Sequence, residues 1–183
     1  DPIHSGLPRI RRTPADEGLP FTTIRIPSSD GLGLEAWNIP RKGGHGTALL
    51  LHGYAAEKSV MLPAAAALRR LGWATLLVDF RGVGGSDGDE TNLGWKEAED
   101  VVSALLYART LSPDKPVIAY AVSMGAAAAL RAAGPLGTSP DALILESPFD
   151  TLERTTRRRF ANMGLPSWPF TDALIFWGGR HSG

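Results

Sequence analysis

A serine lies where a short apolar stretch meets an alanine-rich one. Residues 117–122 are apolar or aromatic, Ser123 follows, and residues 124–133 include six alanines. This order predicts a strand, a sharp turn and a helix, with the serine on the turn. The pattern is Ala121-x-Ser123-x-Gly125, in which small residues on either side of the serine let strand and helix approach closely. A serine on such a strained turn projects its hydroxyl away from the sheet, which makes Ser123 a candidate nucleophile.

The same serine has a simpler interpretation. Serine is a favoured N-cap residue, and Ser123 could act only as the cap of a helix that begins at Met124. The usual motif has glycine where this chain has Ala121, which keeps the small volume but gives up some backbone freedom. The six residues by themselves leave both interpretations open.

Short apolar runs and amphipathic stretches alternate along the rest of the chain. They predict strands at residues 47–51, 73–80, 117–123 and 142–146, and helices at 58–71, 95–109 and 124–133. Continuous apolar runs are typical of strands buried on both faces. The expected fold is therefore α/β, a mostly parallel sheet with helices on both faces. Residues 21–26 and 32–39 alternate around a Ser29-Asp30-Gly31 turn, which predicts an N-terminal antiparallel hairpin at one sheet edge.

The length of 183 residues predicts one domain with a sizeable core. We expect residues 1–20, with four prolines, to form an extended N-terminal arm, and residues 21–149 to form the α/β core. Residues 150–183 contain several arginines and aromatic residues and are expected to form a helical cap or lid. The simplest expectation is that the aromatic side chains pack the cap onto the body and that the arginines form a solvated face.

Composition excludes several functional classes. The chain has 19 basic residues (Lys plus Arg) and 19 acidic residues (Asp plus Glu), so no net positive charge favours nucleic acid as a partner. No cysteine is present and no carboxylate–histidine cluster has ligand spacing, so no metal or other cofactor is expected. No apolar run is long enough for a transmembrane span. The composition suits a soluble domain, while the start at Asp1 suggests that an upstream segment, a signal peptide or an anchor, was removed. Localisation stays open.

Two further motifs follow predicted strands. His52-Gly53-Tyr54 follows residues 47–51, at the position where an acyl-transfer enzyme has one backbone N–H of its oxyanion hole; the residue after the nucleophile has the other. Those donors would be Tyr54 and Met124. A turn with a packed histidine is an equally good interpretation of His52-Gly53.

The second motif, residues 79–88, is rich in glycine but matches neither common phosphate-binding pattern. We expect a tight turn in which Asp79 and Arg81 pair with each other.

Together with Glu146-Ser147-Pro148, these signatures occur in an order that resembles the α/β-hydrolase superfamily. The chain is most similar to serine-aminopeptidase-like and monoacylglycerol-lipase-like hydrolases, from about residue 21 to residue 150. The resemblance implies that Ser123 is the nucleophile of a serine hydrolase. Its substrate would be a small-molecule carboxylic ester, with an amide or peptide as the second choice, and it would need no cofactor.

The catalytic acid and base are the part of the family pattern that this chain does not clearly contain. Family members have the order Ser, then Asp or Glu, then His, and here only His181 follows Ser123. Asp150 or Asp172 could complete a compact triad. The family, however, normally has two further strands after the Glu146 strand, so we expect the C-terminal strands, with the acid and histidine, to be missing from the chain.

Two expectations follow from that interpretation. A sheet that ends early has an open apolar edge, which would associate with the missing C-terminal part or with a second copy of the chain. The alternative function is a non-catalytic α/β-hydrolase-like binding module, or an inactive fragment.

Overall fold

The computed structural model describes residues 12–148, 152–162, 164, 166 and 172. Within this part, strands β1 to β6 form one sheet in the order β1-β2-β4-β3-β5-β6. The strands are β1 (Thr22–Pro27), β2 (Gly33–Ile39), β3 (Thr47–Leu51), β4 (Ala74–Val78), β5 (Val117–Val122) and β6 (Ala142–Glu146). The helices are α1 (Leu62–Arg70), α2 (Glu97–Leu111), α3 (Met124–Ala133) and α4 (Leu152–Asn162), with 3₁₀ turns η1 (Pro14–Glu17) and η2 (Lys58–Met61).

Strand pairing confirms the predicted fold class. β1 and β2 form an antiparallel hairpin at one edge, and β2 continues antiparallel onto β4. β4, β3, β5 and β6 are parallel to one another. Because parallel strands need crossovers, the helices between them lie against the faces of the sheet.

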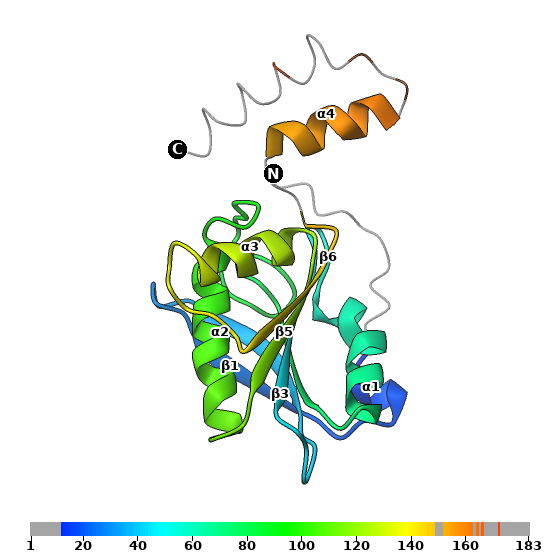
Figure 1. Ribbon diagram of the computed structural model, residues 1–183, viewed down its shortest axis with the longest axis vertical. Helices are drawn as coiled ribbons and strands as arrows, with labels where there is room; N and C mark the ends of the chain where they lie inside the picture. The colour runs from blue at the N-terminus through cyan, green and yellow to red at the C-terminus, as the bar shows by residue number, and fades with distance from the viewer. Residues whose placement is uncertain (1–11, 149–151, 163, 165, 167–171, 173–183) are drawn as a thin grey trace.

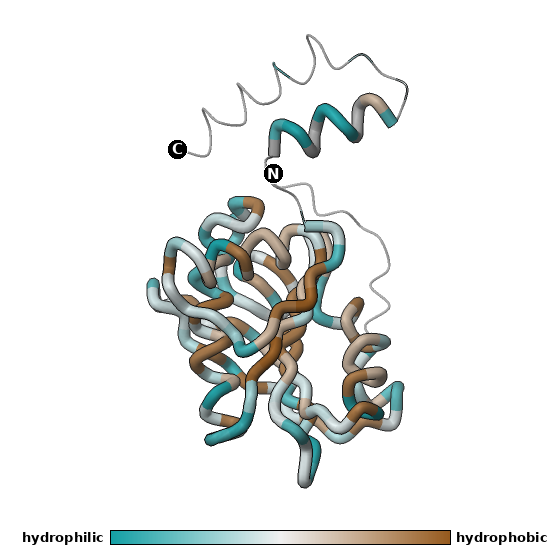
Figure 2. Tube along the Cα trace, in the orientation of Figure 1, coloured by the Kyte–Doolittle hydropathy of each residue, from teal (hydrophilic) through white to brown (hydrophobic). Residues whose placement is uncertain are grey.

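Alternate side chains of the central strands enter two separate cores. Leu49 and Leu51 of β3 belong to a cluster that α2 and α3 cover, whereas Ala48 and Leu50 belong to a cluster beneath α1. Every residue of β3 is buried, as its continuous apolar run predicts. Figure 2 shows the resulting hydrophobic strands at the centre of the molecule. The predicted helices on both faces of the sheet are therefore confirmed.

Local details differ from expectation at three places. Leu106, expected on the buried face of α2, is 57% exposed, because that face is formed by the helical positions of Val101, Ala104, Leu105 and Ala108. The helix predicted from residue 58 begins as the 3₁₀ turn η2, and α1 starts one residue before Pro63, which suits a first helical turn. In the arm expected to be extended, η1 is a 3₁₀ turn with Pro14 buried; residues 1–11 lie outside the described residues.

Beyond β6, the described residues of the predicted cap include one helix, α4, whose surface is mostly polar (Figure 2). In Figure 1, α4 lies beyond the end of the sheet where β5 leads into α3. Its role as a lid stays a prediction. Among the described residues, β6 has a strand partner on one side only, β5, and no strand follows it. None of the helices in this part of the chain is long and apolar enough to span a membrane.

Candidate active site

Ser123 lies on the turn between β5 and α3 in a rarely occupied backbone conformation. Its φ is +50° and its ψ is −110°, outside the regions that non-glycine residues favour. The neighbouring strand holds this conformation, because the Ser123 N–H donates to the Glu146 carbonyl at 2.9 Å. The Ser123 side chain makes no capping hydrogen bond to α3. The simple capping interpretation is therefore wrong, and the strain is of the kind that functional sites retain.

Gly125 permits the tight crossing of α3 over β3. A Cβ added to Gly125 would lie 2.6 Å from the His52 carbonyl oxygen and 2.8 Å from that of Leu51. Only glycine avoids this contact with backbone atoms, which explains the small residue two positions after Ser123. Ala121 on the other side is fully buried in the sheet. The small residues of the sequence motif are therefore a packing requirement.

The loop after β3 lies directly against Ser123. A Cβ on Gly53 would be 3.4 Å from the Ser123 Cβ. Tyr54, the next residue, has an exposed side chain, whereas Met124 is buried at the first position of α3. In the part of the chain that the structure describes, neither the Tyr54 nor the Met124 N–H donates to a backbone acceptor. The first N–H groups of a helix have no partner within the helix, so the Met124 amide is a free donor by its position.

His52 is buried and held in one orientation. Its Nδ1 donates to the Gly53 carbonyl at 2.8 Å, and its Nε2 accepts from the Phe80 N–H at 3.2 Å. Its ring also contacts the Phe80 ring edge to face. Burial lowers the pKa of His52 below its usual value, so the imidazole is neutral. Both ring nitrogens are occupied, and His52 cannot take a proton from Ser123. The His52 side chain is thus packed in the interior, and the role of the Tyr54 N–H as an oxyanion donor stays a prediction.

Asp79 and Arg81 do not pair with each other, which corrects the sequence prediction. Asp79 is fully buried and accepts from the backbone N–H of Lys58 at 2.6 Å, while its other carboxylate oxygen binds the Lys58 ammonium. The ammonium also binds Glu35 at 2.7 Å. The reason lies in the packing of separate elements: Lys58 lies against Asp79, and Asp100 of α2 lies against Arg81, so each buried charge is neutralised by a neighbouring element.

Arg81 binds α2 instead. Its guanidinium contacts the buried carboxylate of Asp100 at 2.6 Å. It also contacts the exposed carboxylate of Asp30 at 2.8 Å. The Arg81 backbone N–H also donates to Asp100 at 3.1 Å. This ion pair fixes the start of the glycine-rich loop to α2, whereas Asp79 fixes it to the region after β3.

A small pocket lies beside these loops. Its volume is about 160 Å³, and its walls include Tyr54, Phe80, Val83, Thr91 and Met124. The Thr91 hydroxyl is turned to Glu97, so the interior is largely apolar. A cavity of similar size in another protein holds benzene. The two predicted oxyanion donors therefore border a space for a small apolar group.

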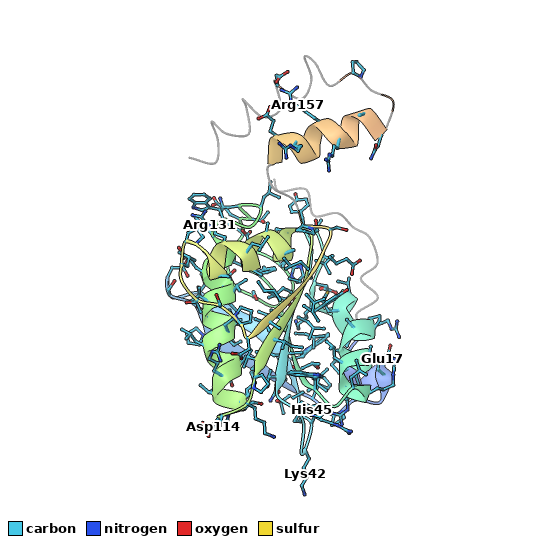
Figure 3. The ribbon with its side chains drawn as sticks, in the orientation of Figure 1. Glu17, Lys42, His45, Asp114, Arg131 and Arg157 are labelled. Carbon is cyan, nitrogen blue, oxygen red and sulfur yellow. The ribbon has the colours of Figure 1, made fainter. Side chains whose placement is uncertain are left out.

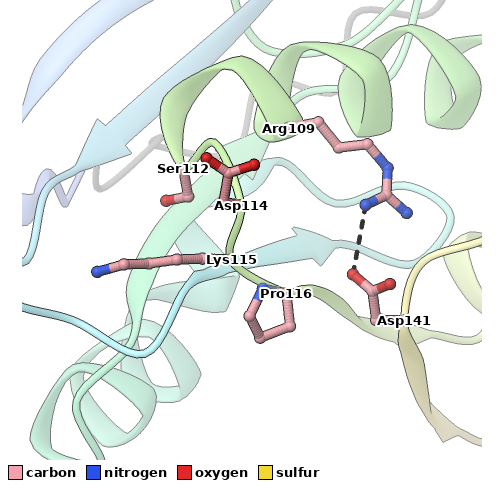
Figure 4. Close-up of a pocket in the computed structure, with 6 residues that line it drawn as sticks. All are labelled: Arg109, Ser112, Asp114, Lys115, Pro116 and Asp141. Atoms are coloured by element: carbon pink, nitrogen blue, oxygen red, sulfur yellow. Dashed lines mark hydrogen bonds and ion pairs between the residues drawn. The ribbon is translucent and has the colours of Figure 1, made fainter.

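A larger pocket of about 480 Å³ lies at the opposite end of the parallel strands. In Figure 4, Arg109 points toward Asp141, with an ion-pair distance of 3.4 Å. The Val117 N–H donates to Asp141 and lowers the pKa of that carboxyl. Figure 3 shows Asp114, another residue of this pocket, near the lower end of the body and far from α4. Parallel sheets bind ligands at the carboxyl ends of their strands, which favours the smaller pocket.

The acid and base candidates do not complete a triad within the described residues. His181 and Asp150 lie outside them. Asp172 is described and binds Arg157 at 2.6 Å, and the Glu146 carboxylate accepts from the Tyr120 hydroxyl. That bond raises the pKa of Tyr120. No group of residues suited to a metal ion occurs in the described part of the chain.

Sequence reasoning missed Lys58, Glu35 and Asp100, which take part in the ion pairs around the site. Lys58 and Asp100 are buried although they lie on helical turns where a charged residue normally faces solvent, and Glu35 in β2 is half-buried. The sequence offered no local signal for the burial of Lys58 and Asp100. Only the neighbouring strand and loop determine it.

Comparisons with known proteins agree with this arrangement. Residues 44–169 match the family described as serine aminopeptidase, S33. An uncharacterised protein of Mycobacterium tuberculosis is 37% identical over 133 residues, which are 70% of this chain and 46% of that protein. The lysophosphatidylserine lipase ABHD12 of Danio rerio is 25% identical over 193 residues, 89% of this chain and 50% of that protein. The chain spans about half the length of the curated relatives it matches.

Solved structures extend the likeness to the fold. The esterase Pf2001 of Pyrococcus furiosus superimposes with a TM-score of 0.75 at 27% identity, over 90% of this chain and 67% of that one. An esterase of Exiguobacterium antarcticum, at 20% identity and a TM-score of 0.58, shows the same fold over 77% of this chain and 55% of that one. Because the family match covers more than half of the chain and the sheet order and helices agree, the chain belongs to the serine aminopeptidase S33 family of the α/β-hydrolase superfamily.

Proposed function

We propose that this chain contains the nucleophile and the oxyanion donors of a serine hydrolase that cleaves small carboxylic esters. The strained backbone of Ser123, on the turn between β5 and α3, is the observation that supports this most strongly. Strain of this kind costs about 1–3 kcal/mol and persists where the surrounding structure enforces it.

In the proposed reaction, the Ser123 Oγ attacks the ester carbonyl carbon as its proton passes to a histidine outside the described residues. The carbonyl oxygen becomes negative and accepts hydrogen bonds from the Tyr54 and Met124 N–H groups. The intermediate collapses, the C–O bond to the alcohol breaks, and the histidine protonates the leaving alkoxide. Water then attacks the acyl-serine by the same route and releases the acid and Ser123.

Two observations favour esters over amides. The pocket beside the oxyanion donors is small and largely apolar, which suits an acyl chain more than a peptide. The structurally similar Pf2001 is an esterase, and a relative is a lysophosphatidylserine lipase, which also cleaves an ester. Fold alone does not distinguish these activities, so this choice rests on the pocket and the relatives.

The competing proposal is a binding module that does no chemistry. One observation favours it. His52 begins the predicted oxyanion loop, but both of its ring nitrogens are already hydrogen-bonded, so it cannot act as the base for Ser123. Such a module would keep the fold and the pocket but would not activate Ser123. The two proposals therefore differ in the reactivity of one hydroxyl.

Labelling with a fluorophosphonate probe, read by intact mass, tests the proposal on the full-length protein. We expect one adduct that the Ser123→Ala variant abolishes and that Ser139→Ala, a change of an exposed serine, leaves intact. Hydrolysis of p-nitrophenyl butanoate should respond in the same way. Labelling that survives Ser123→Ala, or no labelling of the folded protein, would overturn the proposal.

A further inference from the structure

We propose that Asp79 and Lys58 are positioning residues that hold the Tyr54 N–H in place for catalysis. This inference rests on the proposed function, because it concerns one of the two oxyanion donors. It goes beyond that function by assigning a role to a buried ion pair outside the nucleophile motif.

Both ends of this loop, residues 52–58, are bound to two consecutive residues after β4. At its start, the His52 imidazole accepts from the Phe80 N–H at 3.2 Å. At its end, the Lys58 N–H donates to the Asp79 carboxylate at 2.6 Å. Tyr54 lies between these anchors. Its backbone position is therefore set by the end of β4 and not by the loop alone.

The Asp79 carboxylate binds both the backbone and the side chain of Lys58. One carboxylate oxygen accepts from the Lys58 N–H, and the other binds the Lys58 ammonium. Lys58 is 4% exposed and Asp79 is fully buried. The ammonium has a second carboxylate partner, Glu35 at 2.7 Å, and lies 4.6 Å from the centre of the Trp37 ring. A buried ammonium with these partners has one favourable position, so it fixes residue 58 tightly.

Asp79 is itself immobile. The Gly85 N–H donates to its carboxylate at 2.9 Å, and the Ser86 hydroxyl donates to its backbone carbonyl at 2.7 Å. A Cβ on Gly84 would lie 1.8 Å from a carboxylate oxygen, so the glycine-rich loop closes tightly over Asp79. The carboxylate therefore has no free rotamer. This gives the glycine-rich motif a structural role: it locks the group that anchors the loop of residues 52–58.

The catalytic consequence follows from geometry. An oxyanion donor must be about 2.7–3.1 Å from the negative oxygen, and losing one donor costs about 10²- to 10³-fold in rate. A loop released at residue 58 would let the Tyr54 N–H leave that position and would weaken a hydrogen bond that forms only in the transition state. Because Tyr54 also borders the small pocket, we expect the loss to fall mainly on kcat, with a smaller change in KM.

Asp79→Asn on the full-length protein tests the inference. The variant keeps the side-chain shape, but its amide nitrogen would face the Lys58 ammonium or the Lys58 or Gly85 N–H, a donor against a donor. The matched control is Asp100→Asn, which changes an equally buried carboxylate whose hydrogen bonds go to Arg81 and Ser28 and not to residues 52–58. A second variant, Lys58→Met, keeps the apolar stem and removes the ammonium.

For p-nitrophenyl butanoate we expect Asp79→Asn to lower kcat about 10²-fold with KM changed less than about twofold. Asp100→Asn should lower thermal stability to a similar degree while leaving the kcat of folded protein within about threefold of wild type. Hydrogen exchange of peptides that span residues 52–58 should rise in Asp79→Asn and Lys58→Met and stay unchanged in Asp100→Asn.

Three outcomes separate the possibilities. Unchanged kcat and unchanged exchange at residues 52–58 in folded Asp79→Asn would overturn the inference while leaving the proposed function intact. So would equal losses of kcat in the Asp79 and Asp100 variants, which would indicate general destabilisation. If Asp79→Asn does not fold, Lys58→Met decides by the same criteria. If the Ser123→Ala variant hydrolysed the ester as fast as the wild type, that result would instead contradict the proposed function itself.

Discussion

The imidazole Nε2 of His52 accepts a hydrogen bond from the backbone N–H of Phe80, 3.2 Å away. A protonated ring would carry a hydrogen on that nitrogen and would face the Phe80 N–H donor to donor. The contact therefore requires a neutral histidine, in agreement with the lowered pKa that burial gives His52. It ties the loop after β3 to the end of β4 only while His52 is unprotonated.

This dependence predicts that the protein loses stability below neutral pH. The unfolded state binds a proton near the ordinary histidine pKa of 6.5, whereas folded His52 binds it only at a lower pH. Between those two pKa values the unfolded state holds more protons, so the free energy of unfolding is greatest above 6.5 and falls as the pH drops through this window. Chemical denaturation at several values between about pH 8 and about pH 5 measures it.

The His52→Gln variant should be less stable at neutral pH and should show a shallower fall, because the titrating group is gone. His45→Gln changes an exposed histidine and should keep the wild-type slope. An equal slope in the wild type and His52→Gln would show that other groups control the acid sensitivity.

Gly125→Ala should destabilise the protein by about 1–3 kcal/mol, the usual range for overpacking. The added Cβ would lie 2.6 Å from the His52 carbonyl oxygen, and backbone atoms cannot rotate away. Urea denaturation measures the loss. Gly53→Ala is the control for stability, since its Cβ would find an ordinary contact of 3.4 Å, and it should cost less than about 1 kcal/mol. Equal costs at the two positions would show that the crossing of α3 over β3 is not tightly packed.

If the chain hydrolyses esters as proposed, Val83→Trp should shorten the acyl chain that it accepts. Val83 borders the pocket of about 160 Å³ beside Tyr54 and Met124, and a larger side chain would fill it. We expect kcat/KM for p-nitrophenyl hexanoate to fall about tenfold or more while the acetate ester is little affected, since each methylene in an apolar pocket is worth about 1–3 kcal/mol.

Leu71→Trp, which enlarges an exposed side chain away from the pocket, should leave the chain-length profile unchanged. If Val83→Trp lowers the rates of both esters equally, the acyl group binds elsewhere.

The 183-residue polypeptide should self-associate through β6. Among the described residues this strand is paired on one side only, and Ile144 is 46% exposed. A free strand edge with apolar side chains invites pairing with another chain. Sedimentation velocity should show species larger than 19.5 kDa that Ile144→Lys reduces and that Leu136→Lys, a change of an exposed leucine outside the strand, does not. A monomeric wild-type polypeptide would contradict this prediction.

The sequence by itself determined the order of strands and helices and the turn at Ser123. These features depend on neighbours within a few residues: a continuous apolar run such as residues 47–51 forms a buried strand, and an alanine-rich run after a small-residue turn forms a helix. The same local signals located His52, Tyr54 and Met124 at the carboxyl ends of strands.

Only the tertiary structure decided which charges pair. Asp79 and Arg81 are two residues apart, yet they bind Lys58 and Asp100, which are 21 and 19 residues away in sequence. The sequence suggested a local pair because proximity along the chain is all that it shows. In the folded protein the direction of each side chain and the cost of burying an unpaired charge select the partner, and both depend on how separate elements pack.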